Sequence, residues 1–109
     1  MVDWSLRLSE QADRDIASIL AWTDEQFGSA QADTYTETIH LALAALLAGP
    51  DLPGSKIRDD ISSGIRLLHI ARHGRKGRHF LVYRSHEPLV IDVLRVLHDS
   101  MDLPKHIGR

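Results

Sequence analysis

The apolar positions of this chain change their spacing twice, from alternation near the N-terminus to a helical repeat and back to alternation. The first alternating segment places its apolar side chains at Val2, Trp4, Leu6 and Leu8. Successive side chains of a strand point to opposite faces, so this pattern predicts a half-buried β-strand with one solvated face.

A helical repeat follows this strand and predicts two helices. Ser9 is suited to cap the first helix and Gly28 to end it, because serine accepts hydrogen bonds from the first turn and glycine tolerates the backbone angles at a helix end. The apolar stripe of this helix comprises Ala12, Ile16, Ile19, Leu20, Thr23 and Phe27. Ser29 can cap a second helix that ends at Gly49-Pro50. Its stripe comprises Ala32, Tyr35, Ile39, Ala42, Leu43, Leu46 and Leu47. The short connection forces the two helices into an antiparallel hairpin.

The second half of the chain predicts three strands joined by turns. Residues 50–64 hold prolines and glycines without periodicity, and we expect a loop there. The strands are expected at residues 65–73, 78–85 and 89–98. The last of them is apolar on both faces, which predicts a central strand covered on both sides. Leu103-Pro104 should end regular structure, so we expect residues 99–109 to form a mobile tail.

This order of elements predicts one two-layer α+β domain over residues 1–109. It consists of an N-terminal strand, an antiparallel two-helix hairpin and a three-stranded antiparallel meander. The strands form one mainly antiparallel sheet, and the helix pair covers one of its faces.

Composition narrows the class of protein. With 43% hydrophobic and 26% charged residues, the chain is an ordinary globular protein. It has no cysteine, which excludes disulfides and thiolate chemistry and fits a cytoplasmic protein. The N-terminus has no apolar run long enough for a signal peptide or a membrane span, so we expect no membrane association.

The net charge of −2 conceals an uneven distribution. Residues 1–60 carry four Lys and Arg against eleven Asp and Glu, whereas residues 61–109 carry nine against four. The basic half could attract an acidic partner or a polyanion. Alternatively, an acidic helical layer could simply lie over a basic sheet.

Charges inside the last strand are candidates for chemistry. RNA cleavage would need a general acid or base and cations, which His98 with Arg72, Arg84 and Arg95 could supply. In a regular strand Arg95 shares a face with Ile91, Val93 and Leu97, opposite His98, and only a bulge would reverse this. We favour the alternative that Arg95 and Asp92 are structural anchors, each hydrogen-bonded within the fold.

Two further features are candidates for binding: a group of histidines, and two apolar residues outside the helical stripes. His69, His73 and His79 cluster around a basic turn at Gly74–Gly77, but their spacing matches no metal signature, and we expect no metal or other cofactor. Trp22 and Leu41 lie off the apolar stripes of their helices. Such residues are either packed locally or bind an amphipathic partner helix.

In the order of its elements and in its length, the chain resembles the ParE branch of the ParE/RelE toxin superfamily of bacterial type II toxin–antitoxin systems. The segments that carry the resemblance are LSEQADRDIASILAWTDEQFG, AQADTYTETIHLAL, GIRLLHIARH, FLVYR and VIDVLRVLHDSMDL. The most specific is the last strand with its RVLH-x-x-MD ending.

The resemblance implies a toxin that inhibits DNA gyrase and is neutralised by direct binding of an acidic ParD-like antitoxin, without sequence-specific DNA binding by this chain. It makes Trp4, Trp22, Leu41, Arg66, Arg72 and Arg84 candidates for antitoxin binding. The candidates for target binding are Arg75, Lys76, His98 and Met101.

Two alternatives remain within the same superfamily. RelE-like members are ribosome-dependent mRNA endoribonucleases and often carry a tyrosine after the C-terminal histidine. Here no tyrosine follows His98, and the loop before the sheet has only Lys56 and Arg58 as basic groups, so we favour no catalytic residue. The third possibility is a non-toxic interaction module of the same fold.

Overall fold

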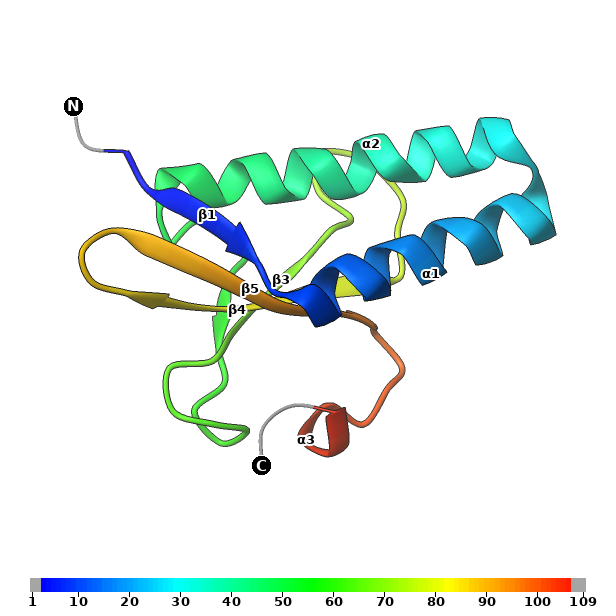
Figure 1. Cartoon of the computed structure of the whole chain (residues 1–109). Coiled ribbons are helices and arrows are strands. Elements are labelled where there is room, and N and C mark those ends of the chain that lie inside the picture. The colour runs from blue at the N-terminus through cyan, green and yellow to red at the C-terminus, as the bar shows by residue number, and fades with distance from the viewer. Residues whose placement is uncertain (1–2, 107–109) are drawn as a thin grey trace.

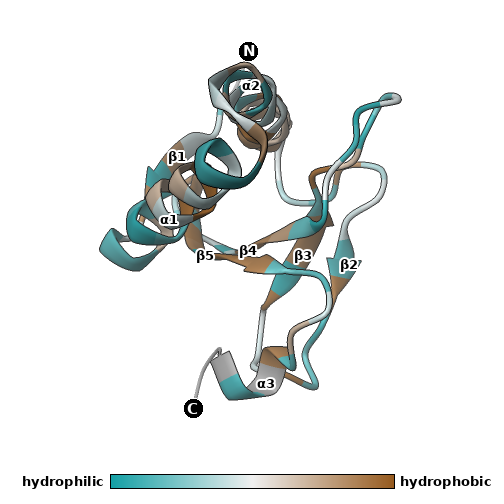
Figure 2. Cartoon of the chain, turned by 90° about the vertical axis from the view of Figure 1, so that its right-hand side faces the viewer, coloured by the Kyte–Doolittle hydropathy of each residue, from teal (hydrophilic) through white to brown (hydrophobic). Residues whose placement is uncertain are grey.

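The computed structural model describes residues 3–106 of the chain. Its elements are β1 (Ser5–Leu8), α1 (Glu10–Phe27), α2 (Ser29–Ala45), the 3₁₀ turn η1 (Leu46–Ala48), β2 (Lys56–Ile57), β3 (Arg66–His69), β4 (His79–His86), β5 (Val90–His98) and α3 (Leu103–His106). The predicted α+β architecture, with a helix pair on one side of a sheet, is confirmed (Figures 1 and 2).

The sheet has five strands in the order β1-β5-β4-β3-β2. The meander β3-β4-β5 is antiparallel, as predicted, and β1 pairs in parallel with β5, with Ser5 opposite Val90. The predicted loop at 50–64 holds the short edge strand β2, which pairs with β3. β5 therefore has a strand on each side, although β4 occupies the middle of the sheet.

Ser9 fixes both the start of α1 and its place on the sheet. Its hydroxyl accepts a hydrogen bond from the Ala12 N–H at 2.9 Å and donates one to the Leu94 carbonyl at 2.8 Å. This confirms the predicted cap. The predicted cap at Ser29 is wrong, because Ser29 already belongs to α2 and Gly28, with φ of 93°, is the cap residue.

The core lies between the helices and the sheet, and its members among residues 3–106 are uncharged. Its fully buried members include Ala12, Ile39, Leu46, Leu81, Tyr83, Ile91 and Val93. Each large side chain buried in this way contributes roughly 1.5–3 kcal/mol. The hydroxyl of Tyr83 donates to the Pro50 carbonyl at 2.9 Å, so this buried polar group is also satisfied.

A second apolar cluster covers the opposite face of the sheet. It comprises Ile61, Ile65, Leu67, Val82, Leu97 and Leu103. Leu103 is only 7% exposed and begins α3. The prediction that regular structure ends at Leu103-Pro104 is therefore wrong, because Leu103 packs on the sheet; residues 107–109 of the predicted tail lie outside the described residues.

A β-bulge changes which face the end of β5 presents. Val82 pairs with Arg95 and Tyr83 with Val93, so Leu94 has no partner in the register. After this extra residue the alternation is shifted. Val96 joins Ile91 and Val93 in the core beneath the helices. The regular-strand prediction that His98 lies opposite Ile91 and Val93 is therefore wrong.

Two residues assigned to the helical stripes are exposed. Phe27 is 65% exposed because the turn between α1 and α2 extends past the end of the sheet (Figure 1). Leu47 is 48% exposed because it lies in the 3₁₀ turn, whose tighter repeat rotates it away from the α-helical stripe. Trp22 and Leu41, predicted to lie off the stripes, are 56% and 52% exposed.

Candidate functional site

The overhang of the helix pair leaves a pocket of roughly 600 Å³ beside the sheet. Its walls come from α1, α2 and the neighbouring ends of β4 and β5. The lining residues are Ser18, Ile19, Trp22, Thr23, Phe27, Gln31, Tyr35, Arg78, His79 and His98. We call this space the distal pocket. Its α1 wall is mostly apolar, whereas its sheet end carries most of its titratable side chains.

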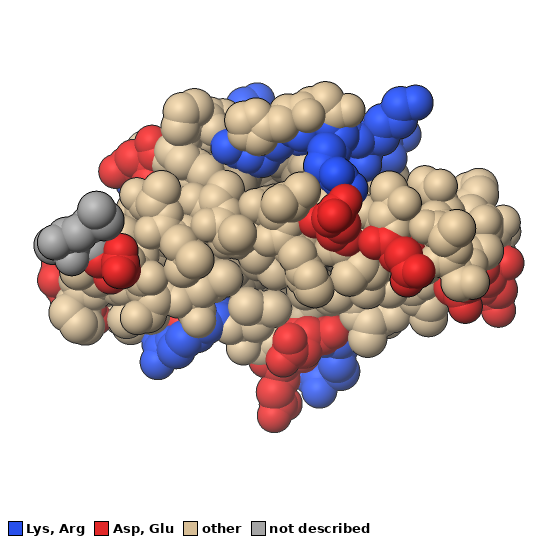
Figure 3. Space-filling view, turned by 90° about the horizontal axis from the view of Figure 1, so that it is seen from above, with Lys and Arg blue, Asp and Glu red and all other residues tan. Residues whose placement is uncertain are grey.

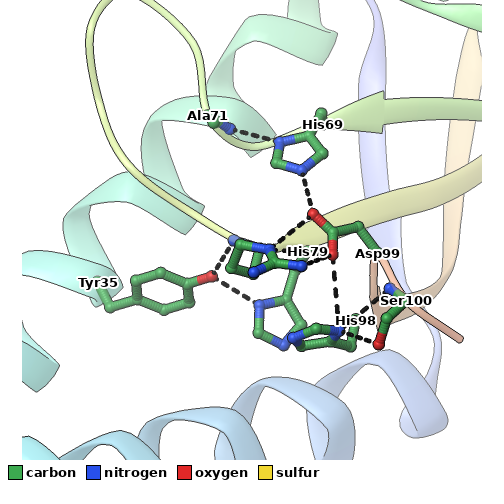
Figure 4. Close-up of polar contacts among 8 residues, drawn as sticks. Tyr35, His69, Ala71, His79, His98, Asp99 and Ser100 are labelled. Carbon is green, nitrogen blue, oxygen red and sulfur yellow. Dashed lines mark hydrogen bonds and ion pairs between the residues drawn. The ribbon is translucent and has the colours of Figure 1, made fainter.

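Tyr35 connects α2 to the sheet end of the distal pocket (Figure 4). Its hydroxyl accepts a hydrogen bond from the Arg78 N–H at 2.9 Å and lies 2.6 Å from His79 Nδ1. Gly77 permits this close approach, because a Cβ there would lie 2.7 Å from the side chain of Ile70 and 3.4 Å from the Tyr35 hydroxyl.

Three histidines from three strands gather at this end of the sheet. His79 and His98 have ring centroids 5.2 Å apart in an edge-to-face arrangement. His69 lies beyond them, 3.0 Å from Asp99 through its Nε2. Of the three histidines predicted around the basic turn, His69 and His79 belong to this group, whereas His73 lies in the turn itself and His98 is the third member.

Backbone and hydroxyl donors fix the tautomers of these rings. The Nδ1 of His69 accepts from the Ala71 N–H at 3.0 Å, and the Nδ1 of His98 accepts from the Ser100 N–H at 3.1 Å. The Tyr35 hydroxyl accepts from the Arg78 N–H and has its own proton left to donate, so we assign His79 Nδ1 as the acceptor of that proton. Each neutral ring therefore carries its proton on Nε2.

Asp99 is the charged centre of this group. The Arg78 guanidinium donates to both of its carboxylate oxygens at 2.9–3.1 Å, and His69 donates to one of them. These hydrogen bonds, led by those from Arg78, hold the pKa of Asp99 well below its ordinary value. Asp99 therefore stays ionised and orients both neighbours.

Burial controls the protonation of the two groups closest to the pocket. It lowers the pKa of His79 from 6.5 to about 4, with a further contribution from the neighbouring His98. It also raises the pKa of Tyr35. At neutral pH the pair is an uncharged phenol and an uncharged imidazole, which can hold a ligand by hydrogen bonds.

The four candidates for RNA cleavage do not converge. Arg95 binds the Asp15 carboxylate through Nε at 2.8 Å, and Asp92 binds Arg7 at 2.8 Å. Both act as anchors, as favoured from the sequence. Arg72 donates to the Pro53 carbonyl at 2.8 Å and Arg84 to the Ser62 hydroxyl at 3.3 Å. Of the four, only His98 lines the distal pocket.

A second, smaller depression lies between α2 and the β3–β4 connection. It measures roughly 310 Å³ and is lined by Thr38, Leu41, Ala42, Ala45, Ile70, Arg72, His73 and Arg75. We call it the α2 groove. Arg75 is fixed along its wall by Thr38 at 2.9 Å and by an ion pair with Glu37 at 2.9 Å. Two antitoxin-binding candidates, Leu41 and Arg72, thus share one surface.

The remaining candidates are dispersed over the molecule. Trp4 is half-buried and packs near Gly49, and Arg66 pairs with Asp51. Lys76 is exposed at the tip of the β3–β4 turn, and Met101 is 43% exposed after β5.

The sequence does not predict that Tyr35, Arg78 and Asp99 belong to the group of polar side chains at the distal pocket. The helical repeat places Tyr35 in the core stripe of its helix, and no local pattern marks the other two.

Ion pairs between the acidic first half of the chain and its basic second half neutralise part of the uneven charge. Arg95 with Asp15 and Arg75 with Glu37 join the basic half of the chain to the acidic helices. Viewed from above α2, much of the surface carries neither acidic nor basic groups (Figure 3). Within residues 3–106, no cluster of His, Asp and Glu side chains could hold a metal ion, and no helix has the length and apolar character of a membrane span.

Comparisons with known proteins agree on one family. Residues 6–103 match the model of the ParE toxin of type II toxin–antitoxin systems, parDE. Toxin ParE1 of Mycobacterium tuberculosis (strain CDC 1551 / Oshkosh) is 31% identical over 100 residues, which cover 92% of this chain and 94% of that protein. Toxin ParE1 of Caulobacter vibrioides is 24% identical, with coverage of 94% and 96%.

Solved structures share the fold. A chain of the chromosomal ParDE toxin–antitoxin system from P. aeruginosa superposes with a TM-score of 0.64 at 18% identity, covering 87% of this chain and 95% of that one. A chain of the RelBE2 toxin–antitoxin complex from M. tuberculosis gives 0.58 at 21% identity, covering 89% and 99%. The family model and the 31% identical relative each span nearly the whole chain, so this protein belongs to the ParE toxin family of type II toxin–antitoxin systems.

Proposed function

We propose that this ParE-type toxin inhibits DNA gyrase in the cytoplasm and is neutralised by direct binding of a ParD-like antitoxin. The observation that carries the proposal is the match of residues 6–103 to the ParE toxin family. That family belongs to parDE systems and one solved relative is a chain of a ParDE system, which supports a ParD-like partner.

The α2 groove is the surface that we assign to the antitoxin. Leu41 is 52% exposed above it, and Arg72 and Arg75 line it. An amphipathic segment could place an apolar side chain beside Leu41 and carboxylates beside the two arginines. Trp22 offers a second exposed anchor, whereas Trp4, Arg66 and Arg84 already have contacts within the fold.

Lys76 and Met101 are the target-binding candidates that best fit a contact with gyrase, because both side chains are exposed. Arg75 and His98 are held by bonds within the chain and would act by positioning these surfaces. The charge of Lys76 would favour an acidic patch on the target.

A supercoiling assay with purified gyrase tests the target. The toxin in excess should reduce supercoiling and trap a DNA-cleaved complex, and Lys76→Ala should weaken both effects. Lys56→Ala, which changes another exposed lysine, on β2, is the matched control. Unchanged supercoiling with no trapped complex would refute gyrase as the target.

Titration calorimetry with the cognate antitoxin tests the binding surface. Leu41→Asp should weaken binding at least tenfold, because it places a carboxylate in an apolar contact. Leu47→Asp is the control, since Leu47 is 48% exposed but does not line the α2 groove. Equal effects of the two variants would remove the groove from the interface.

The arrangement of Tyr35, His79 and His98 favours a second candidate, a RelE-like ribosome-dependent ribonuclease, because it supplies the tyrosine missing after His98. Cleavage of messenger RNA at the ribosomal A site, lost in His98→Ala, would support it. Intact messenger on translating ribosomes would exclude it. Normal growth on expression without antitoxin would instead favour a non-toxic interaction module.

A further inference from the structure

The sheet end of the distal pocket presents hydrogen-bond donors that the fold does not use. The Nδ1 atoms of His79 and His98 both act as acceptors, which leaves the proton of each neutral ring on Nε2. Among residues 3–106, neither Nε2 has a hydrogen-bond partner, and neither is sealed from solvent, since the unpartnered buried side-chain nitrogen belongs to Arg84. Both rings line the pocket.

The opposite wall suits a flat apolar surface. Trp22 and Phe27 meet edge to face, with ring centroids 5.7 Å apart and an angle of 74° between their planes. Ile19 extends the same wall. Aromatic rings pack well against such a corner by offset or edge contacts. A volume of roughly 600 Å³ lies within the range of pockets that hold small molecules.

The charges around the pocket favour an uncharged ligand. The positive charge of Arg78 is matched by Asp99, which it binds through both carboxylate oxygens. His79, with its pKa near 4, adds no charge at neutral pH. An anion beside His79 would therefore meet a neutral ring and the nearby Asp99 carboxylate, and would lose its hydration without gaining an ion pair there.

We propose that the distal pocket binds a small, uncharged, planar aromatic molecule that carries a carbonyl oxygen. Its ring lies against Trp22 and Phe27, and its oxygen accepts a hydrogen bond from the Nε2–H of His79 or His98. Aromatic amides and nucleobases have this chemistry. The inference concerns a ligand of the toxin itself and does not depend on the proposed target or antitoxin.

Three probes of similar shape separate the two parts of the proposal. Benzamide has the ring and a neutral carbonyl, benzoate has a carboxylate, and toluene has no hydrogen-bonding group. Binding to the full chain at pH 7.5 can be followed in proton–nitrogen NMR spectra. The indole signal of Trp22 reports on the pocket, and that of Trp4, packed near Gly49, serves as an internal reference.

Benzamide should shift the Trp22 signal saturably, with a dissociation constant on the order of 1 mM, as is usual for a ligand of this size. Benzoate and toluene should each bind at least threefold more weakly. His98→Phe keeps a ring but removes the donor, and should weaken benzamide roughly fivefold while leaving toluene unchanged.

Two further variants keep the proposal falsifiable if His98→Phe does not fold. Trp22→Ala changes an exposed residue and should abolish the shifts of the His79 and His98 amides, whereas Leu41→Ala, in the α2 groove, should leave them intact. No saturable shift with benzamide, equal binding of benzoate, or full binding by Trp22→Ala would overturn the proposal.

Discussion

The helix pair contacts the sheet differently at its two ends. At the end that holds Ser9, which we call the near end, Ala12 and Ile39 are fully buried, and Asp15 bonds both to Arg95 and to the Val96 N–H at 2.9 Å. At the far end, around Gly28, Trp22 and Phe27 are more than half exposed. There the hydroxyl of Tyr35 joins the helices to the sheet.

The near end of the helix pair therefore stabilises the fold, and the far end is available for binding. Packing at the near end fixes the position of both helices, so the far end can leave side chains exposed without loss of the fold. The cost of the overhang is the apolar surface that its aromatic side chains expose to solvent. The four predictions below test this division, from the largest expected effect to the smallest.

Ile39→Ala should cost about 3 kcal/mol in the free energy of unfolding, because it removes a fully buried side chain and leaves a cavity. Phe27→Ala removes a larger side chain at the far end, but Phe27 is 65% exposed. Its cost should be about 0.5 kcal/mol or less. Urea denaturation of both variants measures the difference, and similar losses would contradict the division.

Asp15→Ala should cost about 2 kcal/mol, because it leaves a partly buried Arg95 without its carboxylate partner and removes the acceptor of the Val96 N–H. Asp13→Ala, at an exposed position of the same helix, is the control and should change stability by about 0.5 kcal/mol or less. Urea unfolding at pH 7 measures both. Equal effects would show that the ion pair does not fix the near end.

Tyr35→Phe should cost about 1 kcal/mol, since one hydroxyl serves both the Arg78 N–H and His79 Nδ1. A purely structural loss would leave the tautomer of His79 unchanged. We expect instead that the nitrogen NMR signals of this ring show a mixture of tautomers in the variant. An unchanged spectrum would mean that Tyr35 does not hold the ring.

The free energy of unfolding should fall by about 1 kcal/mol between pH 6.5 and pH 4.5 because of His79. This figure allows for solvent screening, since the ring of His79 is partly exposed. The folded pKa of His79 is about 4, below its ordinary 6.5. The unfolded chain therefore binds a proton that the folded chain excludes, and stabilisation present above pH 6.5 is lost as pH falls toward 4. The groups that face this ring are Tyr35, His69, Arg78, His98 and Asp99.

His79→Phe should flatten this pH profile, whereas His40→Gln, at an exposed position, should leave it unchanged. The lowered pKa values of Asp15 and Asp99 act below their ordinary value of 3.8 and so do not contribute in this range. A profile that stays steep in His79→Phe would assign the effect to another group.

Local patterns explain why the bounds of α1 and the burial or exposure of several helical side chains could be predicted. The cap at Ser9, the end of α1 at Gly28 and the burial of Ile39 all depend on residues within a few positions of one another. The exposure of Trp22 and Leu41 follows from the same helical repeat. These features need no knowledge of the neighbouring strand.

The contacts of the far end with the sheet could not be predicted, because their geometry depends on long-range pairing. The bulge at Leu94 exists only relative to Val82 and Tyr83 on β4, and it alone brings His98 under the helices. Tyr35 and His79 lie 44 positions apart, with no motif to connect them. β2 has two residues, too few for an alternation to be visible.

The parallel pairing of β1 with β5 has a consequence for synthesis on the ribosome. Arg7 and Asp92 lie 85 positions apart, and so do Ser9 and Leu94, which join the start of α1 to the same strand. At roughly 5–20 residues per second, β1 waits on the order of ten seconds for its partner strand to be made. The side of α1 that packs on β5 stays uncovered during that interval. The nascent chain therefore becomes a folded toxin only after β5 has been made.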